Sequence, residues 1–208
     1  KRIRGLSLGI ALERRDTWLG GGYTSVNAQV YRGTLDIRDA MSEAFDNPPF
    51  GYDTEGSFGK ATVQFARLQY VMPKLSLYVG GGLQRASKNL DTYEKLSLGG
   101  PKAVRAYASG EVLVDDGWLG TVELRFALKP EASLFAFYDA AKGDFFHDPR
   151  AVDVVTSRSL RGHGIGFNWS KPGQVTMNLS VAWRGTGAGL TDGGDRNPRV
   201  YWSIQKAF

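Results

Sequence analysis

A single cation at the tip of a long connecting segment is the feature of this sequence best suited to specific chemistry. Arg105 lies in the tip Val104–Tyr107 of the connection 86–117, and Gly99 and Gly100 precede that tip as a flexible hinge. Long ordered loops are more often functional than decorative. A guanidinium keeps its charge, and its planar fork can bind a carboxylate through two hydrogen bonds. The chemistry to expect is therefore ion pairing with a buried acid.

Two acids are candidates for that pairing. In the segment Trp118–Leu128 most apolar side chains fall on even positions, so Glu123 faces the other side. Asp139 lies in Ala132–Gly143, which is otherwise apolar on both faces, and a carboxylate turned toward lipid would be costly. Alternation for Glu123 and the cost of facing lipid for Asp139 therefore predict that both acids point to the inside of a barrel, where either of them could bind Arg105.

Groups for catalysis or metal binding are sparse. The two histidines, His147 and His163, have no clustered carboxylates near them in sequence, and Cys is absent. Asp115 and Asp116 could bind a cation, but no ligand spacing supports a metal loop. We find no Ser–His–Asp arrangement and no pair of acids suited to catalysis. We therefore expect no enzyme activity, no cofactor and no metal site.

Alternation of period two predicts nine strands and an all-β, antiparallel transmembrane β-barrel. Most segments run about 10–12 residues, longer than typical soluble strands and long enough to cross a bilayer at a tilt. In the third segment the apolar parity changes, and we expect a β-bulge near Ala66-Arg67. The predicted strands are Ile3–Arg14, Tyr23–Asp36, Phe58–Val71, Lys74–Arg85, Trp118–Leu128, Ala132–Gly143, Arg158–Ser170, Gln174–Arg184 and Arg199–Phe208.

The connections and the tryptophans fit a barrel in an outer membrane. Short connections alternate with long polar ones, which is typical of such barrels. Trp118, Trp183 and Trp202 fall next to the long connections, whereas Trp18 and Trp169 fall at the opposite ends. Two such rows predict aromatic girdles at the two membrane interfaces.

Two sets of residues are predicted to face the lumen. The alternating polar positions of the eighth segment would line a wet channel, and they are Gln174, Thr176, Asn178 and Ser180. In the seventh segment Gly162, Gly164 and Gly166 alternate with bulky residues, and we expect them to leave space in which the long loop packs.

Charge and cysteine usage narrow the possible partners. The formal net charge is +5, but the basic residues are spread along the chain with no run of five or more, so we expect no nucleic-acid partner. The absence of Cys fits an oxidising compartment such as the bacterial cell envelope.

The sequence motifs in and around the loop resemble those of a known family. LGGPKAVRAY (Leu98–Tyr107), followed by Gly110-Glu111 and Asp116-Gly117, is similar to the loop signature of two-partner secretion transporters of the ShlB/FhaC/HecB type. ELRF, LFAFYDAAKG (Leu134–Gly143) and the final RVYWSIQKAF (Arg199–Phe208) resemble the later barrel motifs of that family. One departure is Ala106, where the family often has Gly, a residue that adopts backbone angles Ala resists.

The resemblance implies that residues 1–208 are the C-terminal portion of a transmembrane β-barrel, about nine strands of sixteen, with loop 86–117 folding into the lumen. It also implies that Arg105 meets Asp139. The terminal Phe208, with Trp202 in the same strand, would be the signal that the barrel-assembly machinery reads.

The function implied by the resemblance is that of an outer-membrane pore that exports a large unfolded partner exoprotein from the periplasm to the cell surface. The expected partners are that exoprotein, the lipid bilayer of the outer membrane and, during biogenesis, the assembly machinery. Two alternatives remain open: a barrel insertase of the same superfamily, and a surface adhesin or ligand-binding barrel whose long loops do the work. The VRAY and GE motifs favour the secretion function.

Overall fold

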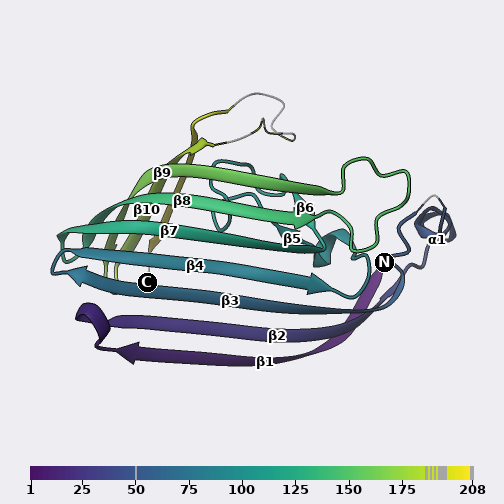
Figure 1. Ribbon diagram of the computed structural model, residues 1–208, viewed down its shortest axis with the longest axis horizontal. Coiled ribbons are helices and arrows are strands. Elements are labelled where there is room, and N and C mark those ends of the chain that lie inside the picture. The colour runs from purple at the N-terminus through teal and green to yellow at the C-terminus, as the bar shows by residue number, and fades with distance from the viewer. Residues whose placement is uncertain (50, 186, 188, 190, 192–195, 207–208) are drawn as a thin grey trace.

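The computed structural model consists of one curved antiparallel sheet with a long loop on its inner side (Figure 1). It describes residues 1–49, 51–185, 187, 189, 191 and 196–206. The nine strands of this sheet follow the order β1-β2-β3-β4-β7-β8-β9-β10-β11, and β5 and β6 form a separate two-stranded ladder. The predicted all-β, antiparallel class is confirmed as a partial barrel. The elements are β1 (Arg2–Asp16), η1 (Trp18–Gly20), β2 (Gly22–Asp36), α1 (Ala40–Asp46), β3 (Gly56–Met72), β4 (Leu75–Ala86), η2 (Thr92–Glu94), β5 (Leu96–Ser97), β6 (Leu113–Val114), β7 (Asp116–Lys129), β8 (Ala132–Asp144), β9 (Ser157–Lys171), β10 (Val175–Arg184) and β11 (Arg199–Lys206).

The two faces of the sheet differ in the way that alternation predicts. One face, here called the outer face, exposes large apolar side chains along most strands, with Leu6 reaching 84% exposure. Successive side chains of a strand point to opposite faces, so the polar positions between these residues belong to the inner face. Examples from the outer face are Leu8, Ile10, Val63, Leu83, Val122, Leu124, Ile165, Leu179 and Ile204.

The main core lies between the inner face and the loop that joins β4 to β7. Side chains from this loop pack on those of β8, β9 and β10. In Figure 1 the loop, with β5 and β6, lies within the curve of the sheet. The buried members are Leu98, Val104, Ala106, Tyr107, Val112 and Val114 of the loop and Phe135, Phe137, Ala141, Leu160 and Ala182 of the strands. Burying these apolar side chains is what holds an otherwise polar loop against the sheet.

Short and long connections lie at opposite ends of the sheet. The links β1–β2, β3–β4, β7–β8 and β9–β10 are short, whereas β2–β3, β4–β7, β8–β9 and β10–β11 are long, as the sequence predicts. The helix α1 within the β2–β3 connection was not predicted. Asp39 caps it by accepting a hydrogen bond from the backbone N–H of Ser42 at 2.8 Å. None of the helices in the described part of the chain has the length and apolar content that a membrane crossing requires.

The predicted bulge position is wrong. Pairing of β3 runs without interruption through Ala66 and Arg67, and the irregularity falls between Tyr70 and Met72. Arg67 and Gln69 therefore share the face of Val63 and Phe65. That placement is tolerated because both polar groups are paired at the short-turn end. Arg67 Nη1 lies 2.9 Å from Asp16 Oδ2, and Gln69 Nε2 donates to the carbonyls of Trp18 and Gly21 at 2.8 Å.

Two further positions differ from the sequence interpretation. Trp202 pairs with Leu179 near the middle of β10, so it does not lie at the end of a strand beside a long connection. Gln174 lies in the turn before β10, where its N–H donates to Lys171 O at 3.0 Å. The predicted eighth segment began one residue too early, at Gln174, whereas β11 begins at Arg199 as predicted and Trp202 is simply three residues inside it.

Candidate functional site

The loop reaches the inner face as a narrow hairpin. After η2, strands β5 and β6 pair, and Leu98 N–H donates to Val112 O at 2.9 Å. Gly100 has a φ of 114°, and a side chain at Gly99 would overlap Ala108 O, so both hinge positions require glycine. The hairpin thus presents its tip to the sheet with little freedom.

Arg105 is bound by both predicted acids. Its Nε and Nη2 donate to the two oxygens of Asp139 at 2.9 and 2.7 Å, and its backbone N–H donates to Asp139 Oδ2 at 3.0 Å. Its Nη1 donates to Glu123 Oε1 at 2.6 Å. The side chains of Arg105, Glu123 and Asp139 are 11%, 8% and 0% exposed. Alternation left the choice of acid open, and the structure uses both.

Neighbouring groups complete a balanced network. Thr121 Oγ1 accepts from Arg105 Nη2 at 2.8 Å and donates to Asp139 Oδ1 at 2.7 Å. Arg125 donates to Glu123 Oε2 through Nε at 2.9 Å and Nη2 at 2.6 Å. Two guanidinium groups therefore face two carboxylates, which avoids a net buried charge. Sequence reasoning missed Thr121 and Arg125, although both share the parity of Glu123 on β7.

Burial and pairing act in opposite directions on Arg105. Burial alone would lower its pKa, but hydrogen bonds and Coulomb attraction from Asp139, and then from Glu123, raise the pKa above the ordinary value. An aromatic ring also contributes, because the centroid of Phe137 lies 3.5 Å from Arg105 Cζ. Arg105 therefore stays a cation at every pH that a cell envelope meets.

The rest of the tip is buried around Arg105. Val104, Ala106 and Tyr107 have almost no exposed surface, and Tyr107 O accepts from Tyr201 of β11 at 2.8 Å. Among the described residues, only Leu19 and Asp53 combine a side chain with a positive φ. Ala106 therefore adopts an ordinary backbone conformation, and its position in the tip does not require Gly.

Glu111 provides a second attachment that the sequence interpretation did not assign. Its Oε1 lies 3.3 Å from Arg158 Nη1 of β9, and its Oε2 accepts from Thr191 N–H at 3.2 Å. Glu111 belongs to the Gly110-Glu111 motif of the loop signature. That motif is the sequence signal that could have identified Glu111, since its burial is visible only in the structure.

Asp115 and Asp116 fasten the base of the loop. Asp115 accepts from Lys95 Nζ at 2.8 Å and from the N–H groups of Leu90 and His147. Burial raises the pKa of Asp115, against the lowering effect of Lys95. The cation beside this acid is thus a lysine. In the part of the chain that the structure describes, no three His, Asp or Glu side chains are grouped as metal ligands would be.

The remaining predicted residues are spread over the last two strands. Asn178 and Ser180 line a hollow of about 400 Å³ together with Arg105 and Glu123, and Thr176 shares their face of β10. Trp202 lies on the outer face with 73% exposure. Phe208 lies outside the described residues.

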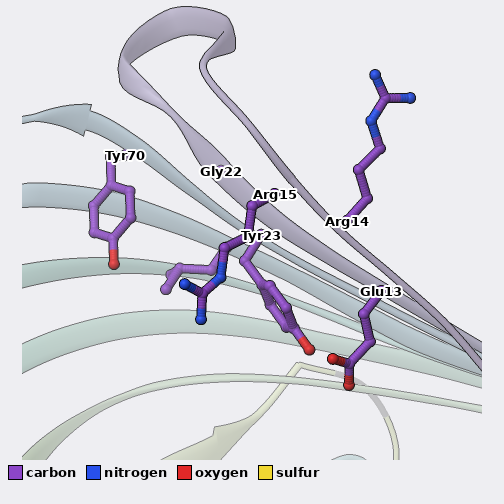
Figure 2. A pocket seen from close by; sticks show the side chains of 7 residues that line it. Glu13, Arg14, Arg15, Gly22, Tyr23 and Tyr70 are labelled. Atoms are coloured by element: carbon purple, nitrogen blue, oxygen red, sulfur yellow. The ribbon is translucent and has the colours of Figure 1, made fainter.

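A second hollow lies away from the loop, at the short-turn end of β1–β3. It measures about 750 Å³ and is lined by Glu13, Arg15, Tyr23 and Tyr70 among others. Figure 2 shows Glu13 and Tyr23 directed toward each other, whereas Arg14 points away. It holds no network comparable to that of Arg105, so the site is placed at the loop tip.

Comparisons with known proteins find relatives and solved structures that are similar to this chain. No family model matches the chain. It is 31% identical over 130 residues to the heme/hemopexin transporter protein HuxB of Haemophilus influenzae strain 86-028NP, covering 58% of this chain and 23% of HuxB. It is 26% identical over 152 residues to HuxB of another Haemophilus influenzae, covering 70% of this chain and 27% of that protein. The chain therefore spans about a quarter of the length of these curated relatives.

Solved structures share the fold. CdiB from Escherichia coli matches 95% of this chain with a TM-score of 0.63 and 20% identity, over 36% of the CdiB chain. CdiB from Acinetobacter baumannii matches 97% with a TM-score of 0.53 and 14% identity, over 42% of its chain. HuxB and CdiB are two-partner secretion transporters, not enzymes, so the resemblance predicted from the loop motifs is confirmed.

Proposed function

We propose that this chain, as part of a two-partner secretion transporter, forms wall and loop of an outer-membrane pore that exports a large unfolded partner exoprotein to the cell surface. The sequence relation to HuxB and the fold shared with CdiB support this proposal. Residues 1–208 would form the C-terminal portion of such a barrel, and further strands from the same protein would close it, because open edges leave backbone groups unpaired in lipid.

The two faces support a location in the outer membrane. The apolar outer face suits lipid, and the inner face carries Thr176, Asn178 and Ser180 beside the loop. Such uncharged polar groups would contact a passing polypeptide without holding it. During biogenesis, Phe208 and Trp202 of the last strand would serve the barrel-assembly machinery.

The observation that carries the proposal is the loop held against the wall by Arg105. We define the loop lock as Arg105 with Asp139 and Glu123, supported by Val104 and Tyr107 in the tip and by Gly99 and Gly100 in the hinge. Asp139 accepts three hydrogen bonds from Arg105 alone. A lock of this kind keeps the loop in the conformation that secretion requires.

The test removes each side of the lock in the complete protein. Arg105→Ala leaves Asp139 without its guanidinium partner and Glu123 with Arg125 alone, and Asp139→Ala leaves Arg105 with Glu123 as its one remaining carboxylate in the lock, so both variants lose export of the co-expressed exoprotein. Lys102→Ala is the matched control, because it removes an exposed cation three residues away in the same loop. Full export by both lock variants at normal barrel levels would reject the role of the lock.

The same strains separate secretion from the insertase alternative. Loss of a secretion pore lowers the exported exoprotein alone and leaves other outer-membrane barrels at normal levels. Loss of an insertase lowers those barrels as well. Quantifying the outer-membrane proteins of the Arg105→Ala strain therefore decides between the two functions.

A further inference from the structure

The tip of the loop rests on a strand position that has no side chain. Gly162 of β9 pairs with Asp139 of β8 on one side and with Arg184 of β10 on the other. It is thus the direct neighbour, on β9, of the acid that binds Arg105. A Cβ added at Gly162 would lie 2.7 Å from Ala106 Cβ, 3.4 Å from Val104 Cγ1 and 3.3 Å from Trp183 O.

The tip cannot simply move away from such a Cβ. The backbone N–H of Arg105 donates to Asp139 Oδ2 at 3.0 Å, which ties the chain at Arg105 to the wall independently of its side chain. Lifting the tip would stretch this hydrogen bond together with the two from the guanidinium. Because hydrogen bonds weaken quickly with distance, the space at Gly162 determines how well the lock closes.

The other two glycines of β9 have a different role. A side chain at Gly164 would overlap the ring of Phe137, and one at Gly166 would overlap the ring of Phe135. These positions make room for the aromatic rings next to Arg105. Of the three glycines that were expected to leave space for the loop, Gly162 alone lies under the tip.

We propose that Gly162 is a positioning residue, which sets the depth at which Arg105 engages Asp139, and that Gly162 and Ala106 form a matched pair in which one member at most carries a Cβ. The inference concerns the same lock as the proposed function and rests on that function only for its export readout. It also explains why Ala is accommodated at position 106 of this chain: the opposite wall residue is Gly.

The test is a double-mutant cycle in the complete protein with two readouts. The chain has no Cys, so Val112→Cys, in the buried core of the loop, reports loop docking through the rate of labelling by a thiol reagent. Gly162→Ala is expected to raise this rate about tenfold or more, because the added methyl group overpacks the contact with the tip and shifts the loop toward its undocked state by about that factor. Export should fall in parallel.

Adding Ala106→Gly to Gly162→Ala removes the closest of the three contacts. The double variant is expected to return labelling and export to nearly the parental level, while Ala106→Gly alone changes either by less than about twofold. Gly82→Ala is the matched control, since a Cβ there meets its nearest atom, Leu119 Cγ, at an ordinary 3.8 Å.

Two results would overturn the inference: parental labelling in Gly162→Ala, or a double variant that stays as labelled as Gly162→Ala or is missing from the membrane. If Gly162→Ala alone fails to accumulate, accumulation and protection of the double variant still support the pair. Labelling needs no exoprotein. Labelling could follow the expected cycle while none of the proteins, the parental one included, exports the exoprotein. That result would reject the proposed function and leave the matched pair intact.

Discussion

The inner face has two halves that use polar residues in opposite ways. The half formed by β7–β10 lies under the loop and buries charges in pairs, with Glu123 and Asp139 around Arg105. The half formed by β2–β4 borders a hollow of about 840 Å³ on the other side of the loop, lined by uncharged groups such as Asn27 and Gln64. Charged side chains are concentrated where the loop pairs with them, and the part of the inner face that the loop leaves uncovered carries mostly uncharged side chains.

The strongest way to break this contrast is to remove a buried charge from the covered half. Glu123→Ala leaves Arg125 without its carboxylate and Arg105 with one of two. The variant loses three hydrogen bonds between charged groups, and such bonds contribute about 1.5–3 kcal/mol each, so we expect the loop to undock and the Val112→Cys thiol to become labelled. Gln64→Ala on the open half is the control and should leave labelling unchanged. Equal labelling in both variants would show that the halves do not differ.

The second test adds volume to each half. Gly164→Ala would overlap Val181 O and the Phe137 ring, whereas Gly82→Ala on the inner face of β4 finds ordinary space. We expect Gly164→Ala to destabilise the loop side by about 2 kcal/mol and Gly82→Ala to have almost no effect. Denaturant-induced release of the loop, followed by thiol labelling, measures both. A Gly82→Ala variant as unstable as Gly164→Ala would contradict the assignment of open space to β4.

Sequence reasoning could assign side chains to a face of the sheet, but it could not predict which of them the loop contacts. Period-two alternation turned Glu123 inward because it sits opposite an apolar row of its own strand, and the cost of a carboxylate in lipid turned Asp139 inward, since its strand is otherwise apolar on both faces. Neither argument could choose between them, since that choice depends on how a loop of some thirty residues folds over strands distant in sequence. The β-bulge near Ala66 was wrong for a related reason: Arg67 finds its partner, Asp16, on another strand, so the parity change needs no extra residue.

The same limit explains the residues that were missed. Thr121 bridges Arg105 and Asp139, and Glu111 reaches Arg158 and Thr191, but neither contact is visible in local spacing. The motif resemblance supplied the pairing of Arg105 with Asp139 that the pattern of alternation alone left open. The glycines of β9 were recognised as space, and only the structure divides that space between the tip and two aromatic rings.

A smaller effect is expected at the edge of the covered half. Arg125 binds Glu123 and lies 4.4 Å from the Tyr78 ring, but its side chain is 30% exposed. Solvent therefore screens part of its charge, and Arg125→Ala should weaken loop docking by about 1 kcal/mol. Labelling of Val112→Cys in this background should rise less than in Glu123→Ala. A rise as large as that variant's would mean that Arg125, not Arg105, is the principal partner of Glu123.

The smallest effect on docking is expected where charge is added to the open half. Thr62 lines the hollow of β2–β4, so a carboxylate in Thr62→Glu would stay in contact with solvent. Docking should change by less than about 0.5 kcal/mol, because exposed surface substitutions rarely exceed that value. The added negative charge should nevertheless shift the selectivity of the reconstituted pore toward cations, which reversal potentials in planar bilayers measure. Thr62→Gln, which keeps the side-chain length without the charge, is the control. A Thr62→Glu variant that releases the loop would show that the loop and this wall are coupled, and the two halves would then have to be treated as one.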